Sequence, residues 1–301
     1  MDGCNIFQNM VQKTKIVKKP QNNIVYIVVF GIIAAITLQS SILFIRHLIY
    51  QKNQNTKIQK TPSITPYYEN TVFEKPSILI ATQSALIKHP IKIPIIMYHY
   101  VEDIKDPGDT VRKKLNITPS QFEKQPISLK KNNYETYFVK DIPDIINGLV
   151  DYSTQSAVLT FDDGYKDFYS NAFPLLKKYH MRGTIYIIQN DIGKPEFLSH
   201  RQIQEMLDSL LIEVGSHTLT HAYLKTMSDN AAKKQIVESK KKLEEEFNIK
   251  VETFAYPNGA FNQKTVELVK EASYSAAVSV ISGTIQSQEN LFFLSRIRQG
   301  L

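Results

Sequence analysis

Residues 157–164 read AVLTFDDG, an apolar run that ends in two adjacent carboxylates and a glycine. A short apolar run bounded by a turn signal indicates a buried strand of a parallel sheet. Adjacent residues of a strand point to opposite faces, so Asp162 and Asp163 can share a site only where the strand ends and the chain turns. Gly164 permits such a turn. An acidic turn that caps the following helix is the alternative interpretation.

Strand-like runs alternate with helical patterns on both sides of this segment. The runs of strand type are residues 91–99, 157–161, 184–188, 212–215, 253–256 and 276–280. The helical patterns lie near residues 119–131, 167–179, 199–210, 228–247 and 262–271. This alternation predicts an α/β fold with a parallel sheet, open or closed into a barrel, in one domain that spans residues 91–301.

A second polar segment, SHTLTH at residues 216–221, also follows a strand and a glycine. His217 and His221 are four residues apart, which would place both on one helical face and close enough to share a cation. Two unrelated surface histidines are an equally good explanation of this pattern alone. Because both segments follow strands at the same end of the sheet, one aspartate of the pair and the two histidines would form a three-ligand metal site with an open position.

Two further segments follow strands at the same end. In FAYPNG, residues 254–259, Pro257 and Gly259 indicate a turn that would leave a backbone N–H, such as that of Asn258, free to point into the site. An ordinary turn between a strand and a helix is the alternative. In MYHY, residues 97–100, His99 would lie at the end of the first strand, where a single histidine is more often structural than catalytic.

With TFDDG, SHTLTH and FAYPNG in this order, the chain from about residue 93 to its end resembles the polysaccharide deacetylases of carbohydrate esterase family 4, the NodB homology domain. The MYHYV opening and FAYPNG look most like the bacterial branch that includes the poly-N-acetylglucosamine deacetylases. The resemblance implies a distorted (β/α) barrel. It also implies hydrolysis of N-acetyl groups from amino sugars of a cell-surface polysaccharide, poly-N-acetylglucosamine first and peptidoglycan second.

The resemblance implies a role for each matching residue. The ligands of one divalent metal ion, usually zinc, would be Asp163, His217 and His221. Asp162 would be the general base for a metal-bound water that attacks the amide carbonyl. The N–H of Asn258 would stabilise the oxyanion together with the metal. Tyr256 and Pro257 would contact the substrate.

The chain departs from the family pattern at two places. Ala255 stands where the family often has an arginine that orients the base, and Leu-Ser-Arg at 294–296 replaces a late Leu-x-His that supplies the usual acid. From these absences we expect Arg296 or Arg298 to orient the base and His99 to act as the general acid. A non-catalytic polysaccharide-binding relative and an O-acetyl esterase acting on a glycan such as acetylxylan are the alternatives.

The N-terminal part contains an uncharged segment of 22 residues, residues 24–45. A helix that spans a bilayer core needs about 20 apolar residues. The segment is longer than the apolar region of an ordinary signal peptide, and no small-x-small cleavage site follows it, which favours an uncleaved signal anchor. Residues 1–23 would be a short tail. Residues 46–90, rich in Gln, Asn, Lys, Thr and Pro, would be a linker.

The net charge of +7 lies entirely in residues 1–60, and the remaining chain balances 28 basic against 28 acidic residues. A nucleic-acid-binding protein needs a basic face on its folded part, so we expect no nucleic-acid partner. The excess flanks the apolar segment and indicates a membrane surface. Charges on the two sides of residues 24–45 are too similar to orient the span. We expect a single pass of the cytoplasmic (inner) membrane with the domain facing the periplasm or exterior, where polysaccharide lies.

Overall fold

The computed structural model describes residues 90–106 and 108–299. The predicted tail, the predicted membrane span and all but the last residue of the predicted linker lie outside these ranges. Within the described ranges, no helix is both long enough and apolar enough to cross a bilayer.

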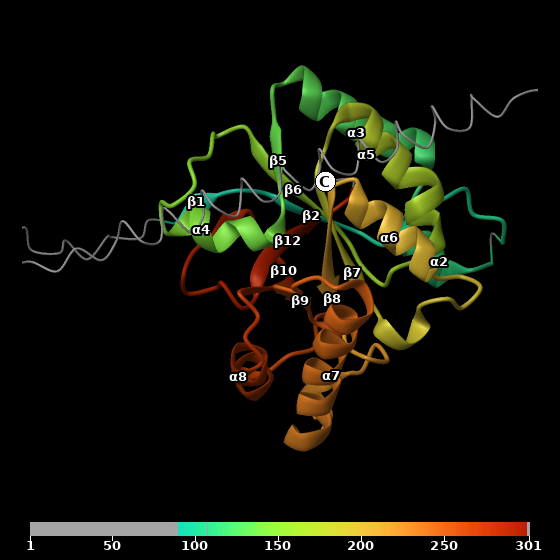
Figure 1. Ribbon diagram of the computed structural model, residues 1–301. Helices are drawn as coiled ribbons and strands as arrows, with labels where there is room; N and C mark the ends of the chain where they lie inside the picture. Colours follow the sequence, from blue (N-terminus) through green and yellow to red (C-terminus); the bar gives the residue numbers. More distant parts are fainter. Residues whose placement is uncertain (1–89, 107, 300–301) are drawn as a thin grey trace, which may run out of the picture. The chain divides into compact units, whose positions relative to one another are not determined.

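Seven parallel strands close into a barrel (Figure 1). In spatial order they are β2 (Ile95–Tyr98), β12 (Leu294–Arg298), β10 (Ala276–Ser282), β9 (Thr253–Ala255), β8 (Ile212–Ser216), β7 (Gly183–Ile187) and β6 (Ser156–Phe161). The barrel closes because β2 also pairs with β6, with Ile95 opposite Val158 and Tyr98 opposite Phe161. An eighth strand, β5 (Glu135–Tyr137), pairs with the first half of β6. The predicted α/β barrel is confirmed.

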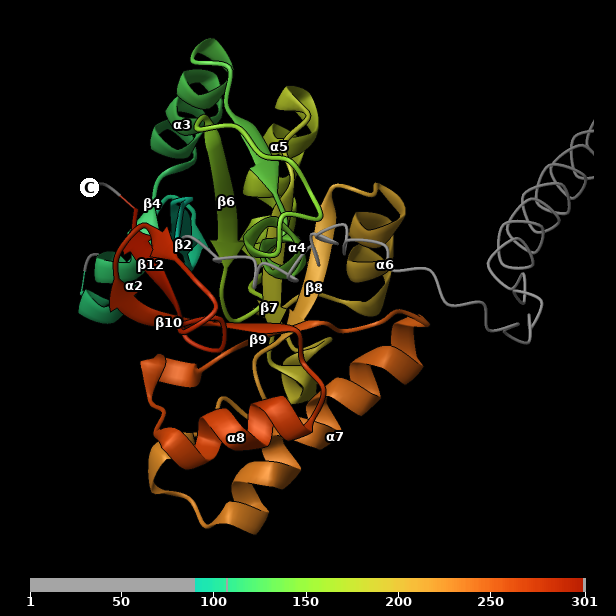
Figure 2. The same cartoon turned by 90° about the vertical axis from the view of Figure 1, so that its left-hand side faces the viewer.

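Helices connect most successive strands and cover the outside of the barrel. The five longer ones are α3 (Pro119–Lys131), α5 (Phe173–Tyr179), α6 (His200–Asp208), α7 (Asp229–Phe247) and α8 (Gln263–Glu271). Figures 1 and 2 show α3 beside α5 and α7 beside α8. No helix connects β10 to β12, and the ladder between them is irregular between Val278 and Ser282. This connection is one source of the distortion of the barrel.

Short elements complete the described chain. They are α2 (Thr110–Leu115), α4 (Ile142–Ile146), the pair β1 (Ile91–Lys92) with β11 (Ile285–Gln286), and the pair β3 (Tyr100–Val101) with β4 (Asn116–Ile117). Three of the five longer helices begin where a side chain accepts a hydrogen bond from the first turn: Thr118 caps α3, Ser199 caps α6 and Asn262 caps α8. In each case the third helical residue bonds back to the cap, which fixes the start of the helix.

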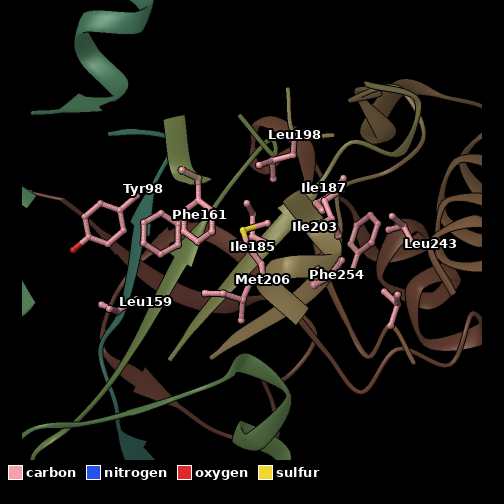
Figure 3. Close-up of a cluster of buried hydrophobic side chains, with 14 of the residues drawn as sticks. Tyr98, Leu159, Phe161, Ile185, Ile187, Leu198, Ile203, Met206, Leu243 and Phe254 are labelled. Carbon is pink, nitrogen blue, oxygen red and sulfur yellow. The ribbon is translucent and has the colours of Figure 1, made fainter. Parts of the chain in front are cut away.

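Strand alternation divides the buried side chains into two groups. One group fills the barrel and includes Ile95, Val158, Tyr186 and Leu294. The other lies between the strands and the helices, and Figure 3 shows part of it, with the ring of Tyr98 stacked beside that of Phe161. Residues of even number therefore point inward on β6 and β12. This alternation places the candidate site residues described next.

Candidate metal and catalytic site

The predicted site residues follow strands that end at the same end of the barrel. His99 follows β2, Asp162 and Asp163 follow β6, and His217 follows β8. Parallel strands bring their carboxyl ends together, which is where active sites of α/β barrels lie. Asp162 continues the inward alternation of Val158 along β6, so its side chain faces the barrel axis.

The turn after β6 brings the second carboxylate into the same site. Asp163 adopts φ 75° and Gly164 adopts φ 78°, both in the left-handed region. Without this turn, Asp163 would point away from Asp162. A non-glycine residue in this region costs of order 1 kcal/mol, and such residues concentrate at functional sites.

His217 and His221 reach Asp163 from a turn, and the predicted helical face is wrong. Thr218 has φ 71° and His221 has φ 55°, values that a right-handed helix cannot contain. Gln235 of α7 holds the turn, because its Oε1 accepts the N–H groups of Leu219 and Thr220, each at 3.1 Å. The result is compact: Nε2 of each histidine lies 3.3 Å from Oδ1 of Asp163.

The donor set of these three residues fits a divalent metal ion. One ligand atom from each lies within 4.8 Å of the others. Oδ1 of Asp163 is buried and has no hydrogen-bond partner in the described chain, and a cation would satisfy that oxygen. Nδ1 of His217 lies 2.8 Å from the carbonyl oxygen of Ala255, which can only accept. Nδ1 therefore carries the proton, and the lone pair of Nε2 faces Asp163. Two imidazoles and one carboxylate are typical of zinc sites that keep an open position.

Arg296 holds the second carboxylate of the site. Its Nη1 donates to Oδ1 of Asp162 at 2.7 Å and its Nη2 to Oδ2 at 2.8 Å. The same guanidinium is fixed by the Ser279 carbonyl oxygen at 2.7 Å and by Oγ1 of Thr160 at 3.1 Å. Burial alone would raise the pKa of Asp162, but the Arg296 charge and hydrogen bonds hold it well below its usual range. Of the two predicted arginines, Arg298 is exposed and makes no such contact.

His99 lies next to this ion pair. Its Nε2 is 3.9 Å from Oδ2 of Asp162, and its side chain is 18% exposed. Burial lowers the pKa of His99, while the carboxylates of Asp162 and Asp163 oppose that effect. His99 is therefore a second titratable group that borders Asp162 and stays partly open to solvent.

The FAYPNG segment forms a tight turn beside the site. Asn258 has φ 56° and Gly259 has φ 63°. Tyr256 is only 1% exposed, and its hydroxyl donates to the carbonyl oxygen of Phe292 at 2.9 Å. Pro257 is also buried. The structure thus gives Tyr256 and Pro257 a role in fixing the turn, and this placement argues against the predicted substrate contact of both side chains.

Three supporting residues were not predicted from the sequence. Thr160 could have been found, because it stands two residues before Asp162 and shares its inward face. Gln235 and Ser279 carry no such signal, because they lie on α7 and β10, far in sequence from the residues that they bond. Their contribution depends on tertiary packing.

A parallel barrel with two histidines and two carboxylates at the carboxyl ends of its strands has the side chains that a metal-assisted hydrolase site requires. Comparison with known proteins agrees with that class. The sequence profile of the polysaccharide deacetylase family matches residues 150–277. The chain is 30% identical to YxkH of Bacillus subtilis (strain 168), which is named as a candidate polysaccharide deacetylase, over 217 residues that cover 71% of this chain and 75% of that protein.

Two more relatives extend this result. The poly-β-1,6-N-acetyl-D-glucosamine N-deacetylase of Staphylococcus aureus (strain MSSA476) is 26% identical over 200 residues, 62% of this chain and 68% of that protein. The solved structure of the Streptococcus pyogenes deacetylase PplD in complex with acetate aligns with a TM-score of 0.65 and 30% identity, over 70% of this chain and 93% of that one. The chain belongs to the polysaccharide deacetylase family, whose members are hydrolases of carbon–nitrogen bonds.

Proposed function

We propose that this protein removes N-acetyl groups from amino sugars of a cell-surface polysaccharide, with poly-N-acetylglucosamine as the first candidate and peptidoglycan as the second. One observation carries the proposal: the cluster of Asp163, His217 and His221 lies beside an ionised Asp162 that Arg296 holds by both oxygens. The name of the Staphylococcus aureus relative supports the first polymer. The acetate in the PplD complex supports the reaction type, because acetate is the acid that deacetylation releases.

Asp163, His217 and His221 would hold one divalent ion, which we propose is zinc. When bound, such an ion polarises the substrate carbonyl and makes a neighbouring water more acidic. The bond to the Ala255 carbonyl oxygen holds a proton on Nδ1 of His217, which leaves Nε2 as the nitrogen that would bind the ion. The left-handed turns at Asp163 and His221 hold these donor atoms together before any ligand binds.

Asp162 would take a proton from the attacking water. Its low pKa keeps it ionised across the neutral range, and the two bonds from Arg296 fix the direction of its lone pairs. Water adds hydroxide to the carbonyl carbon, the carbon–nitrogen bond breaks, and acetate leaves. His99, 3.9 Å from Asp162, would donate the proton that the leaving amine nitrogen requires. The N–H of Asn258 would donate to the oxyanion from the FAYPNG turn.

The non-catalytic alternative rested on the two family residues that the sequence lacks. Ala255 cannot contact Asp162 as the family's usual arginine would, but Arg296 makes an arginine contact to Asp162 from another strand. His99, 3.9 Å from Asp162, would serve as the proton donor in place of the late histidine. Neither absence therefore favours a binding-only protein.

We also propose that residues 24–45 anchor the protein in the cytoplasmic membrane, with the catalytic domain on the outer side. The uncharged length of the segment and the location of the substrate polymers support this arrangement. An anchored enzyme would act on polymer close to the membrane.

Acetate release tests the proposal. The full-length protein is incubated with oligomers of β-1,6-linked N-acetylglucosamine, with peptidoglycan fragments and with acetylated xylan, before and after metal removal by a chelator. Chelator-sensitive release from an N-acetylated substrate is expected, together with its loss in Asp162→Asn. Release from xylan alone would establish the ester hydrolase, and oligomer binding without release from any substrate would establish the binding-only protein.

A further inference from the structure

A cavity of about 600 Å³ opens next to the candidate site, at the same end of the barrel. Its walls come from β3 and the segment that follows it, from α2, from the segment after the Asp-Asp-Gly turn, and from residues 195–196. None of the proposed metal ligands lines it. Tyr165, which does line it, is only two residues from Asp163. The cavity therefore adjoins the reaction centre without being part of it.

One wall of the cavity is a stack of flat groups. The rings of Tyr100 and Tyr165 lie 4.1 Å apart between centroids, at an angle of 22°. Phe197 stacks on Tyr165 at 5.1 Å, and the guanidinium of Arg112 covers Tyr100 at 4.4 Å. Both faces of Tyr100 and of Tyr165 are covered within this stack, so the two rings line the cavity with their edges and make the wall rigid.

The remaining walls carry an excess of negative charge. The acidic lining residues are Glu102, Asp103, Asp106, Asp109, Asp167 and Glu196. The basic ones are Lys105, Arg112 and Lys166. Arg112 is already engaged, because it donates to Glu102 at 2.7 Å and to Glu196 at 3.2 Å. Asp103, Asp106 and Asp167 form no ion pair with any residue in the described ranges.

Asp167 is the acidic residue best placed to bind a cation. It is partly buried in the wall, and its Oδ2 accepts the N–H of Val101 at 2.5 Å. Burial raises the pKa of Asp167 to about 6, against the effect of that hydrogen bond, and the charge of Glu102 adds to the increase. A bound cation would stabilise the ionised form that the protein alone disfavours.

The chemistry of the cavity matches a sugar that carries a positive charge. If the proposed function is correct, the reaction itself makes such sugars, because each deacetylated unit keeps a free amine that is protonated at acidic and neutral pH. We propose that this cavity binds a glucosamine unit of the same polymer chain, next to the N-acetylated unit in the metal site, with the ammonium facing Asp167 and Asp103. The enzyme would then act preferentially beside units that it has already deacetylated.

Binding separates this proposal from the proposed function, because binding needs no turnover. Isothermal titration of the full-length protein at neutral pH and low salt would use the β-1,6-linked glucosamine trimer and its fully N-acetylated counterpart. We expect the glucosamine trimer to bind about tenfold more tightly. In Asp103→Asn/Asp167→Asn that preference should fall to about twofold or less. Asparagine at 167 can still accept the Val101 N–H, so the double variant preserves the local hydrogen bond.

Glu245→Gln is the matched control, because Glu245 is an exposed carboxylate on α7, and it should keep the tenfold preference. A preference for the acetylated trimer, equal binding of both, or an unchanged preference in the double variant would overturn the proposal. Acetate release is then compared between trimers with and without a terminal glucosamine. This comparison measures whether a neighbouring glucosamine raises the rate of deacetylation. If no trimer releases acetate while the selective binding persists, the proposed function fails and the glucosamine site stands.

Discussion

The guanidinium of Arg296 binds both carboxylate oxygens of Asp162, at 2.7 and 2.8 Å, and the two residues are only 2% and 3% exposed. The pair joins the middle of β12 to the end of β6, two strands that are far apart in sequence and that flank β2 in the barrel. A planar fork that matches a carboxylate fixes its orientation more firmly than a point charge can. The direction in which Asp162 can accept a proton is therefore set by β12.

The variant Arg296→Lys should lower kcat by about 10- to 100-fold, because one ammonium cannot hold both oxygens. The pKa of Asp162 should rise toward its usual range, since burial raises it and only Arg296 opposes that strongly. Activity needs the ionised form, so the acidic limb of the pH profile of kcat/KM should move to higher pH. Arg298→Lys, on the exposed end of the same strand, is the control. An acidic limb that does not move in Arg296→Lys would show that Arg296 does not control Asp162 as described.

The variant His99→Gln should lower kcat by about 10²- to 10⁴-fold, because the leaving amine then has no protein proton donor. The metal content and the thermal stability should stay near those of the wild type, since His99 is not among the proposed ligands. Steady-state acetate release with metal analysis checks both statements. If His99→Gln turns over normally while Asp162→Asn is inactive, another group supplies the proton.

The stability of the protein should depend on Asp167 in mildly acidic solution. The pKa of Asp167 is raised to about 6 in the folded protein, so folding favours the protonated side chain. The stabilisation that results is fully present below the ordinary aspartate pKa and is lost as the pH rises through 6. Between pH 4 and pH 7, the free energy of unfolding of the wild type should fall by about 1 to 2 kcal/mol relative to that of Asp167→Asn, after allowance for solvent screening. Melting curves at a series of pH values would measure this difference. A difference in stability between wild type and Asp167→Asn that does not change with pH would contradict this prediction.

Gly259 should be intolerant of a side chain. Its φ is 63°, and a Cβ there would lie 2.1 Å from Cγ2 of Val280. We expect Gly259→Ala to destabilise the protein by about 2 to 4 kcal/mol, through backbone strain and a steric clash. Gly148→Ala isolates the first cause, because Gly148 has φ 68° with nothing within 4 Å of a Cβ, and it should cost about 1 kcal/mol. Gly259→Ala/Val280→Ala should recover the steric part. Equal losses of stability in Gly259→Ala and Gly148→Ala would show that the contact with Val280 is unimportant.

The sequence predicted the elements whose signal is local. The apolar runs that become β6, β7, β8 and β10 are bounded by turn residues, and their alternation with helices predicts an α/β fold with a parallel sheet, whereas closure into a barrel was implied by the family resemblance. The Asp-Asp-Gly turn was predicted because two adjacent carboxylates cannot otherwise share a site, and the positive φ of Asp163 confirms that turn. β12 was missed, because Leu-Ser-Arg-Ile-Arg has charged residues at alternate positions and looks like an exposed segment. Arg296 is inside the barrel only because Asp162 is there to pair with it.

The wrong predictions about the site residues also concern features that depend on tertiary packing. Spacing of four residues predicted a helical face for His217 and His221, but Thr218 and His221 adopt left-handed conformations that no spacing reveals. Tyr256 was expected at the substrate, yet its ring packs between Phe254 and Phe261 in the outer core. Local spacing specifies which residues can meet, and tertiary packing decides how they meet.

Metal titration with acetate release tests the central claim most directly. The metal-free full-length protein receives zinc in increments, and acetate release from N-acetylglucosamine oligomers is followed at each addition. We predict that activity rises linearly and levels off at one equivalent, that His217→Ala shows no such rise, and that Arg298→Lys matches the wild type. Full acetate release by thoroughly metal-free wild type, or undiminished zinc-dependent release by His217→Ala, would contradict the assignment of Asp163, His217 and His221 as the ligands of the working metal.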